Sequence, residues 1–286
     1  MCCIKLRYES LIYCYIFCVG LLSLVCLAMS EIVVKNKRID YIQEGKGSCT
    51  FLLIHGWGGS MKSLFKLFNL LKDDYQCVML DLPGFGKSEN PDPDWGIGEY
   101  ADLVSEFIKK LNLKKVILFG HSFGGAISIY LAANYPDLVD KLILVAPSYR
   151  RENPCGIPES KTFWEKVKKL TKNPVYERLK PRIKSFRKLL YKIFYPRSEV
   201  LKYPHLESNF RKIVTQDLSD LLPKIKQKTL MLWGDKDTFV PLSHSFILKA
   251  RIKNSKLKVY NDVGHGLPKF KPEWVYMEIR KFVEED

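Results

Sequence analysis

Short apolar runs that alternate with helix-like segments constrain the fold of this chain more than any other feature. Each run is continuous rather than alternating, which is typical of strands buried on both faces of a parallel sheet. The clearest runs are TFLLIH at 50–55, QCVMLD at 76–81, KVILFG at 115–120, KLILVA at 141–146 and TLMLWG at 229–234. Segments with helical periodicity separate them, at 63–71, 98–111 and 124–135. This order predicts right-handed crossovers and one doubly wound α/β sheet.

Weaker strand signals extend the sheet at both ends. Residues 32–34 and 38–43 alternate in hydropathy and predict a hairpin ahead of the first buried strand. After the TLMLWG run, a helix near 243–250, a strand at 256–260 and a closing helix from Glu273 restore the βα order. The sequence therefore predicts an α/β protein with a mostly parallel, eight-stranded sheet.

The alternation is interrupted in the second half of the chain. Helix-like stretches there, such as 163–170 and 182–194, are separated by prolines, and none of the runs has the pattern of a buried strand. We predict a core formed by residues 30–147 and 223–286, with residues 148–222 inserted as a basic helical cap.

The positive charge of the chain is concentrated in the same insert. The formal net charge is +15, and residues 150–228 hold 21 Lys and Arg against 8 Asp and Glu. Such a surface could contact an anionic membrane, an acidic substrate or nucleic acid, and a solvated Lys-rich helical face explains it equally well. No nucleic-acid-binding motif accompanies the charge, so nucleic acid is not an expected partner. Anionic lipid stays open as a partner of the basic cap.

The first 29 residues form a separate segment. Residues 11–29 contain no charged side chain and follow Lys5 and Arg7. At about 1.5 Å per residue, this run is long enough to span a bilayer core of roughly 30 Å. It is interpreted as an uncleaved membrane anchor, as a cleaved signal peptide, or as sequence ahead of a true start at Met29. The first interpretation predicts a membrane protein, and the third predicts a cytoplasmic one.

A pentapeptide at the end of the third buried run points to chemistry. Gly120-His121-Ser122-Phe123-Gly124 stands between KVILFG and a helix that begins with small residues. In the G-x-S-x-G pattern the serine lies on a sharp turn above the carboxyl edge of the sheet, where ligands of open α/β sheets bind. The glycines leave room for strand and helix to approach each other. Ser122 is therefore the predicted nucleophile, and the Phe123 N–H lies at a helix N-terminus that favours an anion.

Five motifs in order give the chain a specific family resemblance. They are HGWGG at 55–59, DLPGFGKS at 81–88, GHSFGG at 120–125, WGDKD at 233–237 and VGH at 263–265. In this arrangement the chain resembles the α/β-hydrolase superfamily, in particular its capped esterase and carbon–carbon-bond hydrolase branches, over about 32–147 and 223–286. The resemblance implies that the N–H groups of Trp57 and Phe123 form an oxyanion hole. It implies no metal ion and no organic cofactor.

The acid and the base follow later strands. Asp235 and Asp237 both come just after TLMLWG. The family's Gly-x-x-Asp arrangement ahead of a Val-Pro pair implies Asp237 as the acid. The position after the 141–146 strand, where some relatives carry the acid, has no carboxylate. His265 follows the last strand in the order Ser–Asp–His expected for this fold, and it is the predicted general base.

The other four histidines are assigned no catalytic role. His55 is expected to anchor the loop that follows its strand, and His121 is expected to point its side chain away from the serine. His205 falls in the cap and His244 on a later helix. Asp81 belongs to a turn with structural glycines and is likewise assigned no role.

The resemblance implies a serine hydrolase that cleaves a small-molecule carboxylic ester or related acyl substrate through an acyl-enzyme. A carbon–carbon hydrolase acting on a vinylogous diketone acid and a lysolipid or monoacylglycerol lipase are the alternatives within the fold. A non-enzymatic receptor or scaffold is disfavoured because serine, acid and base are all present. Substrate selection is assigned to the cap. Candidates for the pocket wall are its aromatic residues Phe163, Trp164, Phe186, Tyr191, Phe194 and Tyr203.

Overall fold

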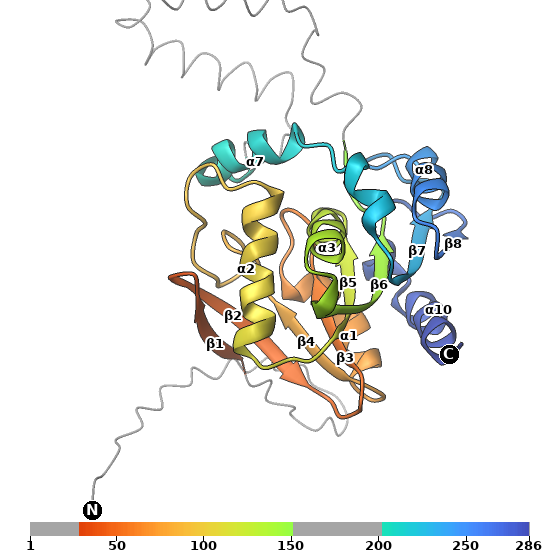
Figure 1. Cartoon of the computed structure of the whole chain (residues 1–286), viewed down its shortest axis with the longest axis horizontal. Helices are drawn as coiled ribbons and strands as arrows, with labels where there is room; N and C mark the ends of the chain where they lie inside the picture. The colour runs from red at the N-terminus through yellow and green to blue at the C-terminus, as the bar shows by residue number, and fades with distance from the viewer. Residues whose placement is uncertain (1–28, 151–201, 286) are drawn as a thin grey trace, which may run out of the picture.

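Eight strands form one sheet in the order β1-β2-β4-β3-β5-β6-β7-β8 (Figure 1). The structure, a computed structural model of the chain, describes residues 29–150 and 202–285. The strands are β1 (Ser30–Val34), β2 (Lys37–Glu44), β3 (Thr50–Ile54), β4 (Gln76–Leu80), β5 (Val116–His121), β6 (Val139–Val145), β7 (Lys228–Gly234) and β8 (Ser255–Tyr260). β2 pairs antiparallel with β1 and with β4, and all other neighbours are parallel. The predicted mostly parallel, eight-stranded sheet is confirmed.

Helices cover both faces of the sheet, as a doubly wound fold requires. One face packs against α2 (Ile97–Lys110), α3 (Phe123–Asn134) and α8 (Ser243–Arg251). The other packs against α1 (Phe65–Leu71), α9 (Leu267–Phe270) and α10 (Pro272–Glu284). The 3₁₀ helices η1 (Met61–Leu64) and η2 (Pro136–Leu138) complete the connections. Figure 1 shows α2 and α3 side by side in front of the central strands.

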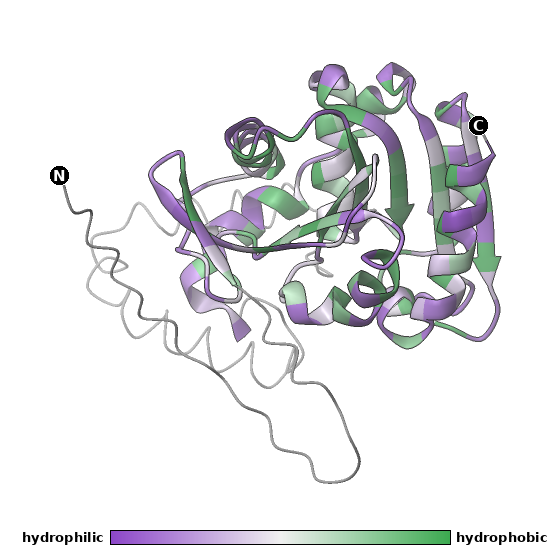
Figure 2. Ribbon diagram, turned by 90° about the horizontal axis from the view of Figure 1, so that it is seen from below, coloured by the Kyte–Doolittle hydropathy of each residue, from purple (hydrophilic) through white to green (hydrophobic). Residues whose placement is uncertain are grey.

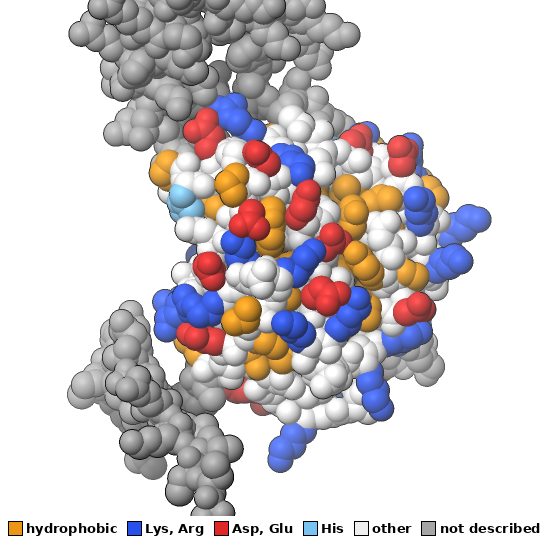
Figure 3. Space-filling model, turned by 60° about the vertical axis from the view of Figure 1, so that its left-hand side comes forward, with side chains coloured by type: hydrophobic (Ala, Val, Ile, Leu, Met, Phe, Trp, Pro, Cys, Tyr) orange, Lys and Arg blue, Asp and Glu red, His pale blue; other side chains and the backbone are white. Residues whose placement is uncertain are grey.

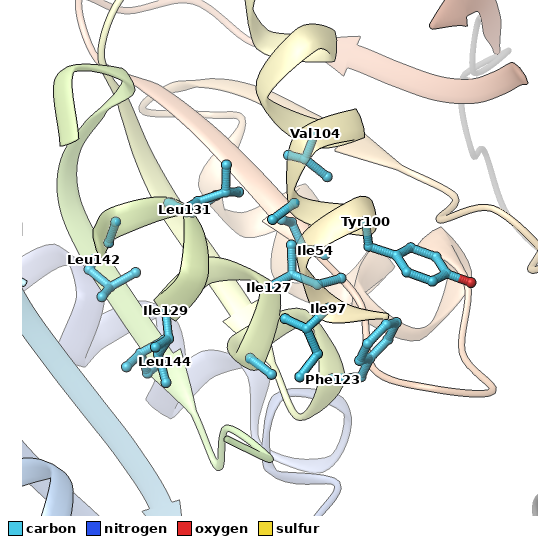
Figure 4. Packing of buried hydrophobic residues seen from close by; sticks show 14 of the residues in the cluster. Ile54, Ile97, Tyr100, Val104, Phe123, Ile127, Ile129, Leu131, Leu142 and Leu144 are labelled. Carbon is cyan, nitrogen blue, oxygen red and sulfur yellow. The ribbon is translucent and has the colours of Figure 1, made fainter. Parts of the chain in front are cut away.

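The apolar runs are continuous because each strand contributes to two cores. In β3, Leu52 and Ile54 pack toward α2 and α3, whereas Phe51 and Leu53 pack toward α1 and α10. Figure 4 shows Ile54 in one cluster with side chains of α2 and α3. α2 and α10 are amphipathic, whereas α3 is apolar and buried along most of its length; Figure 2 shows helices in which hydrophilic and hydrophobic residues alternate. Each fully buried Leu, Ile or Phe stabilises the fold by about 1.5–3 kcal/mol relative to an exposed one.

The predicted helices agree with the structure except where a helix is short. The helices predicted at 98–111, at 124–135 and from Glu273 are found as α2, α3 and α10, each shifted by one residue. The segment predicted as one helix at 63–71 is divided into η1 and α1. The sequence did not predict α9, because four residues are too few to show helical periodicity.

The described part of the predicted cap comprises residues 148–150 and 202–222. It contains η3 (Pro204–Leu206), α7 (Glu207–Val214) and η4 (Ser219–Lys224). The predicted helical stretches at 163–170 and 182–194 lie outside the described residues, as does the apolar run before Met29. Within 29–150 and 202–285, none of the helices combines the length and apolar character that crossing a bilayer requires.

Polar contacts fix α7 against the start of α2. The Lys212 ammonium lies 2.7 Å from the Glu99 carboxylate. The Gln216 side-chain oxygen accepts the N–H of Ile97 at 2.7 Å, which satisfies a first-turn donor of α2 that has no partner inside its own helix. The Tyr203 hydroxyl donates to the carbonyl of Gly58 at 2.8 Å. This segment therefore lies over the loop that follows β3, beside the turn that carries Ser122.

Candidate active site

The backbone at Ser122 has the strained conformation that the sequence predicts. Ser122 has φ 53° and ψ −113° and stands between β5 and α3. A non-glycine residue in such a conformation costs about 1–3 kcal/mol and persists only where its surroundings enforce it. Here the Ser122 N–H donates to the carbonyl of Val145, and the N–H of Ser148 donates to the carbonyl of Ser122, both at 3.0 Å. The end of β6 therefore holds the turn from both sides.

The glycine that follows the turn lets α3 approach β3. A Cβ atom on Gly124 would lie 2.6 Å from the carbonyl oxygen of His55. Because that oxygen belongs to the backbone, the helix would have to move away from the strand to accept any side chain. Gly124 therefore sets the height of Ser122 above the sheet.

Asp237 and His265 are hydrogen-bonded to each other. The His265 Nδ1 lies 2.8 Å from the Asp237 Oδ2, and the Asp237 side chain is completely buried while that of His265 is 19% exposed. A carboxylate oxygen only accepts, so Nδ1 carries the proton and Nε2 is left with a lone pair. This is the tautomer that a general base at Nε2 requires.

The loop after β7 fixes the Asp237 carboxylate. Its Oδ1 accepts the backbone N–H groups of Phe239 at 2.8 Å and Val240 at 2.9 Å. The indole N–H of Trp233 in turn donates to the carbonyl of Val240 at 3.0 Å. One carboxylate oxygen is therefore held by the backbone, and the other is free to orient His265.

Asp235 has a different partner. Its Oδ1 accepts the N–H of Asp262 at 2.7 Å, in the loop between β8 and α9. The described hydrogen bonds of Asp235 do not include one to His265. The geometry thus favours Asp237 over Asp235 for the proposed acid.

The two predicted oxyanion donors belong to the loops that flank Ser122. Phe123 is the first residue of α3, so its N–H has no partner inside the helix. In the described part of the chain the backbone N–H of Trp57 donates to no protein acceptor. Both residues line the same cavity as Ser122. Two free N–H groups at a helix N-terminus and an adjoining loop suit a developing negative charge.

His55 holds the loop that carries Trp57. Its Nδ1 lies 2.8 Å from the carbonyl of Gly56, and its Nε2 accepts the N–H of Leu82 at 3.0 Å. Burial lowers the pKa of His55 below its ordinary value, which keeps the ring neutral. Asp81 accepts the N–H of Met61 at 2.7 Å and that of Lys87 at 3.0 Å. Both residues connect loops, as the sequence suggested.

The structure adds to the sequence prediction at His121. The sequence predicts a ring that points away from the serine but not what that ring contacts: Nε2 lies 2.8 Å from the carbonyl oxygen of His265, and the two imidazole centroids are 4.9 Å apart. His205 lies exposed beside Tyr203 in the cap. His244 is buried, and its ring packs 5.5 Å from that of Tyr149. Of the four histidines set aside, His121 alone contacts the predicted base among the described residues.

A cavity of about 230 Å³ lies in front of Ser122 and His265. Its apolar wall includes the rings of Trp57 and Phe123, which are 5.5 Å apart. The sequence did not single out several further wall residues, namely Ser148, Arg150, Phe210, Ile213, Val214 and Gln216. The i, i+3, i+4 spacing of Phe210, Ile213 and Val214 in α7 is the signal that could have identified these three.

The predicted cap aromatics contribute little to this wall as far as the structure describes them. Tyr203 contacts the Trp57 ring at 6.5 Å from the outer side of the loop and does not line the cavity. The other five candidates lie outside the described residues.

Ser122 and His265 line the same cavity. Within the described residues, no hydrogen bond joins the Ser122 hydroxyl to the His265 ring. Catalytic hydrogen bonds are often long before substrate binds and tighten in the complex. The arrangement therefore fits a base that reaches its nucleophile once a substrate is seated.

Comparison with known proteins agrees with this geometry. Residues 50–272 match the family model described as the alpha/beta hydrolase fold. A 2-hydroxy-6-oxononadienedioate/2-hydroxy-6-oxononatrienedioate hydrolase of Escherichia coli O81 (strain ED1a) is 29% identical over 250 residues, which cover 81% of this chain and 85% of the relative.

Two solved structures share both fold and sequence similarity with the chain. A membrane phospholipase A, a bacterial virulence factor, is 26% identical with a TM-score of 0.68, covering 90% of this chain and 86% of its own. A thermophilic esterase from Thermogutta terrifontis is 25% identical with a TM-score of 0.68, covering 90% of this chain and 98% of its own. Strand order, turn geometry and the match over most of the sequence lead to one conclusion: the chain belongs to the α/β-hydrolase fold family.

Proposed function

We propose that this hydrolase is a serine hydrolase that cleaves a carboxylic ester or related acyl substrate, with Ser122 as nucleophile, His265 as base and Asp237 as acid. The observation that carries the proposal is the 2.8 Å hydrogen bond between a buried Asp237 and His265, on the wall of the cavity that Ser122 also lines. A buried carboxylate that fixes one imidazole tautomer beside a strained serine suits nucleophilic catalysis.

The first half of the reaction forms an acyl-enzyme. The Ser122 oxygen attacks the substrate carbonyl carbon while His265 Nε2 takes the hydroxyl proton. The carbonyl oxygen becomes an oxyanion that accepts the N–H groups of Trp57 and Phe123. The bond to the leaving oxygen then breaks, and His265 returns the proton to the departing alcohol.

The second half of the reaction releases the carboxylic acid product. Water loses a proton to His265 as its oxygen attacks the acyl carbon, and the same two N–H groups stabilise the second oxyanion. The Ser122–acyl bond breaks, and the proton on His265 returns to the Ser122 oxygen. Through both halves Asp237 stabilises the imidazolium without itself being protonated.

Carbon–carbon hydrolysis is the second candidate, and one cavity residue favours it. Arg150 lines the cavity two positions after Ser148, whose N–H bonds to the Ser122 backbone. A guanidinium on this wall suits a substrate that bears a carboxylate. The E. coli relative is by name a hydrolase of dienedioates and trienedioates, which carry two such groups. A substrate of this kind would place one carboxylate toward Arg150 and the ketone carbonyl toward Ser122.

A lipid substrate is the third candidate, suggested by the likeness to a membrane phospholipase A. The face drawn in Figure 3 adds no support from charge. Figure 3 shows Lys and Arg intermixed with Asp and Glu on the face that it presents. On α7, Arg211 pairs with Glu207, and Lys212 pairs with Glu99. The proposal for an ester or acyl substrate therefore does not depend on a membrane surface.

Labelling with a fluorophosphonate probe tests the nucleophile. We expect the wild-type protein to be labelled and Ser122→Ala to be unlabelled, whereas Ser208→Ala on α7 serves as a serine control and keeps full labelling. Equal labelling of wild type and Ser122→Ala would contradict the proposal. Turnover of p-nitrophenyl esters, of a vinylogous diketone acid and of a lysophospholipid then ranks the three substrate classes.

A further inference from the structure

We infer that His121 is a positioning residue, which ties the backbone of His265 to the turn that carries Ser122 and so sets the approach of the base to the nucleophile. The inference rests on the proposed function, and it assigns a task to the histidine inside the G-x-S-x-G pentapeptide. His121 does not touch the substrate in this scheme, because it acts through the main chain of His265.

The hydrogen bond of His121 has one possible polarity. Its Nε2 lies 2.8 Å from the carbonyl oxygen of His265, and a carbonyl oxygen only accepts. Nε2 therefore carries the proton, and Nδ1 carries a lone pair. The rings lie 4.9 Å apart with an interplanar angle of 40°, so the side chains are in contact as well.

The Nδ1 atom of the His121 ring lies near Gly56, in the loop that carries the proposed oxyanion donor Trp57. A Cβ atom on Gly56 would lie 3.2 Å from His121 Nδ1 and 3.1 Å from the Cβ of Ser122. The ring therefore fills the space between the turn, the base and the residue before Trp57. A displacement of this ring would therefore disturb the turn with Ser122, the backbone of His265 and the loop with Trp57.

The surroundings of His121 favour the neutral form of its ring. Removal from water, together with the nearby His265, lowers the pKa of His121 to about 3. The other ionisable groups that act on it are Asp237, which favours its protonation, and His55, which opposes it. A neutral His121 leaves the imidazolium of His265 as the only cation of this pair during turnover.

A second contact completes the support of the base loop. On the side away from His121, the loop between β8 and α9 is held by Asp235 through the Asp262 N–H and by the Lys236 N–H, which donates to the carbonyl of Val263 at 3.0 Å. These bonds tie the loop to β7, the strand of the acid. Among the described hydrogen bonds, that of His121 alone ties His265 to the strand of the nucleophile.

Two substitutions distinguish the effect of the His121 hydrogen bond from the effect of its packing. His121→Gln places an amide N–H near the position of Nε2, whereas His121→Leu fills similar space without a donor. We expect His121→Leu to lower kcat for p-nitrophenyl butyrate by about tenfold to a hundredfold with little change in KM, as small misplacements of catalytic groups do. We expect His121→Gln to recover most of that loss. All rates are expressed per active site titrated with the fluorophosphonate probe.

The outcomes distinguish the inference from the proposed function. If the kcat of His121→Leu per titrated site equals that of wild type, the positioning role is wrong while the serine mechanism stands. If wild type neither reacts with the probe nor turns over ester, the proposed function fails and the inference fails with it. A ¹H–¹⁵N spectrum of the His121 ring at pH 5 gives an independent readout. It should show a neutral ring protonated at Nε2, and a charged ring would overturn the inference.

Discussion

At the scale of single residues, two carboxylates that stand two positions apart have different partners. Asp237 is buried and bonds to the His265 ring, whereas Asp235 accepts a backbone N–H of the loop in which His265 lies. The turn after β7 produces this difference, because backbone N–H groups capture Asp237 Oδ1 and point Oδ2 toward the base. One residue is thus placed to orient the imidazole and the other to hold its backbone.

Asp237→Asn should reduce activity far more than it reduces stability. The amide oxygen of asparagine can still accept the Phe239 and Val240 N–H groups, but its amide group donates toward His265 Nδ1 and forces the other tautomer. The base then presents a proton to Ser122 instead of a lone pair. We expect kcat for p-nitrophenyl butyrate to fall by about three to four orders of magnitude.

Asp235→Asn is the matched control for this experiment. Asparagine at this position can still accept the Asp262 N–H through its side-chain oxygen, so kcat should stay close to that of wild type. Steady-state kinetics of both variants, with circular dichroism to verify folding, makes the comparison. A larger loss in Asp235→Asn than in Asp237→Asn would show that the acid was assigned to the wrong residue.

At the scale of elements, α7 forms part of the cavity wall. Phe210, Ile213 and Val214 line the cavity, while Arg211 and Lys212 form ion pairs outside it. The Phe210 ring also lies 5.1 Å from that of Trp57, next to the proposed oxyanion donor. The helix therefore places residues of the predicted cap on the wall of the cavity that Ser122 lines.

Phe210→Ala should change which acyl chains are accepted. The substitution removes a nearly buried ring from the apolar wall, so long acyl chains lose contact area. We expect KM for p-nitrophenyl decanoate to rise about tenfold, with a smaller effect on the acetate ester. Phe246→Ala on α8 is the control, because Phe246 is 60% exposed and does not line the cavity. An unchanged chain-length profile in Phe210→Ala would remove α7 from substrate selection.

The elements that the sequence predicted well are those in which local pattern and tertiary structure agree. Strands such as β3 are apolar on both faces, so the run TFLLIH predicts both the strand and its burial. The turn at Ser122 follows from two glycines at fixed spacing. The His121 contact could not be predicted, because it joins residues 144 positions apart and depends on how two loops meet. The part of the cavity wall that α7 forms was not predicted, because the spacing of Phe210, Ile213 and Val214 does not by itself show what the apolar face of a helix contacts.

At the scale of the whole molecule, two histidines link stability to pH. Burial lowers the pKa of His55, and removal from water together with His265 lowers that of His121 to about 3, both from an ordinary value of 6.5. As pH falls below 6.5 the unfolded chain takes up these protons before the folded chain does. The contribution of His121 to stability is therefore fully present above pH 6.5 and is lost as pH falls toward 3, and that of His55 changes in the same direction.

The melting temperature should accordingly fall when pH is lowered from 7 to 4. Because carboxylates also contribute in this range, the informative quantity is the difference between wild type and His121→Gln. Glutamine does not titrate, so the variant should lose less stability per pH unit than wild type between pH 6.5 and 4. Differential scanning fluorimetry across this range measures both slopes. Equal slopes would mean that His121 takes up its proton in the folded and unfolded states alike.

The hydrogen bond between His121 and His265 also has a consequence for how the protein is made. It joins positions 144 residues apart, and β8 is both the last strand of the chain and the edge of the sheet. During synthesis the amino-terminal part of a chain emerges first, so the turn with Ser122 leaves the ribosome well before the acid and the base. In the proposed mechanism, Ser122 therefore stays inert until the loop with His265 has been synthesised and has packed against the turn after β5.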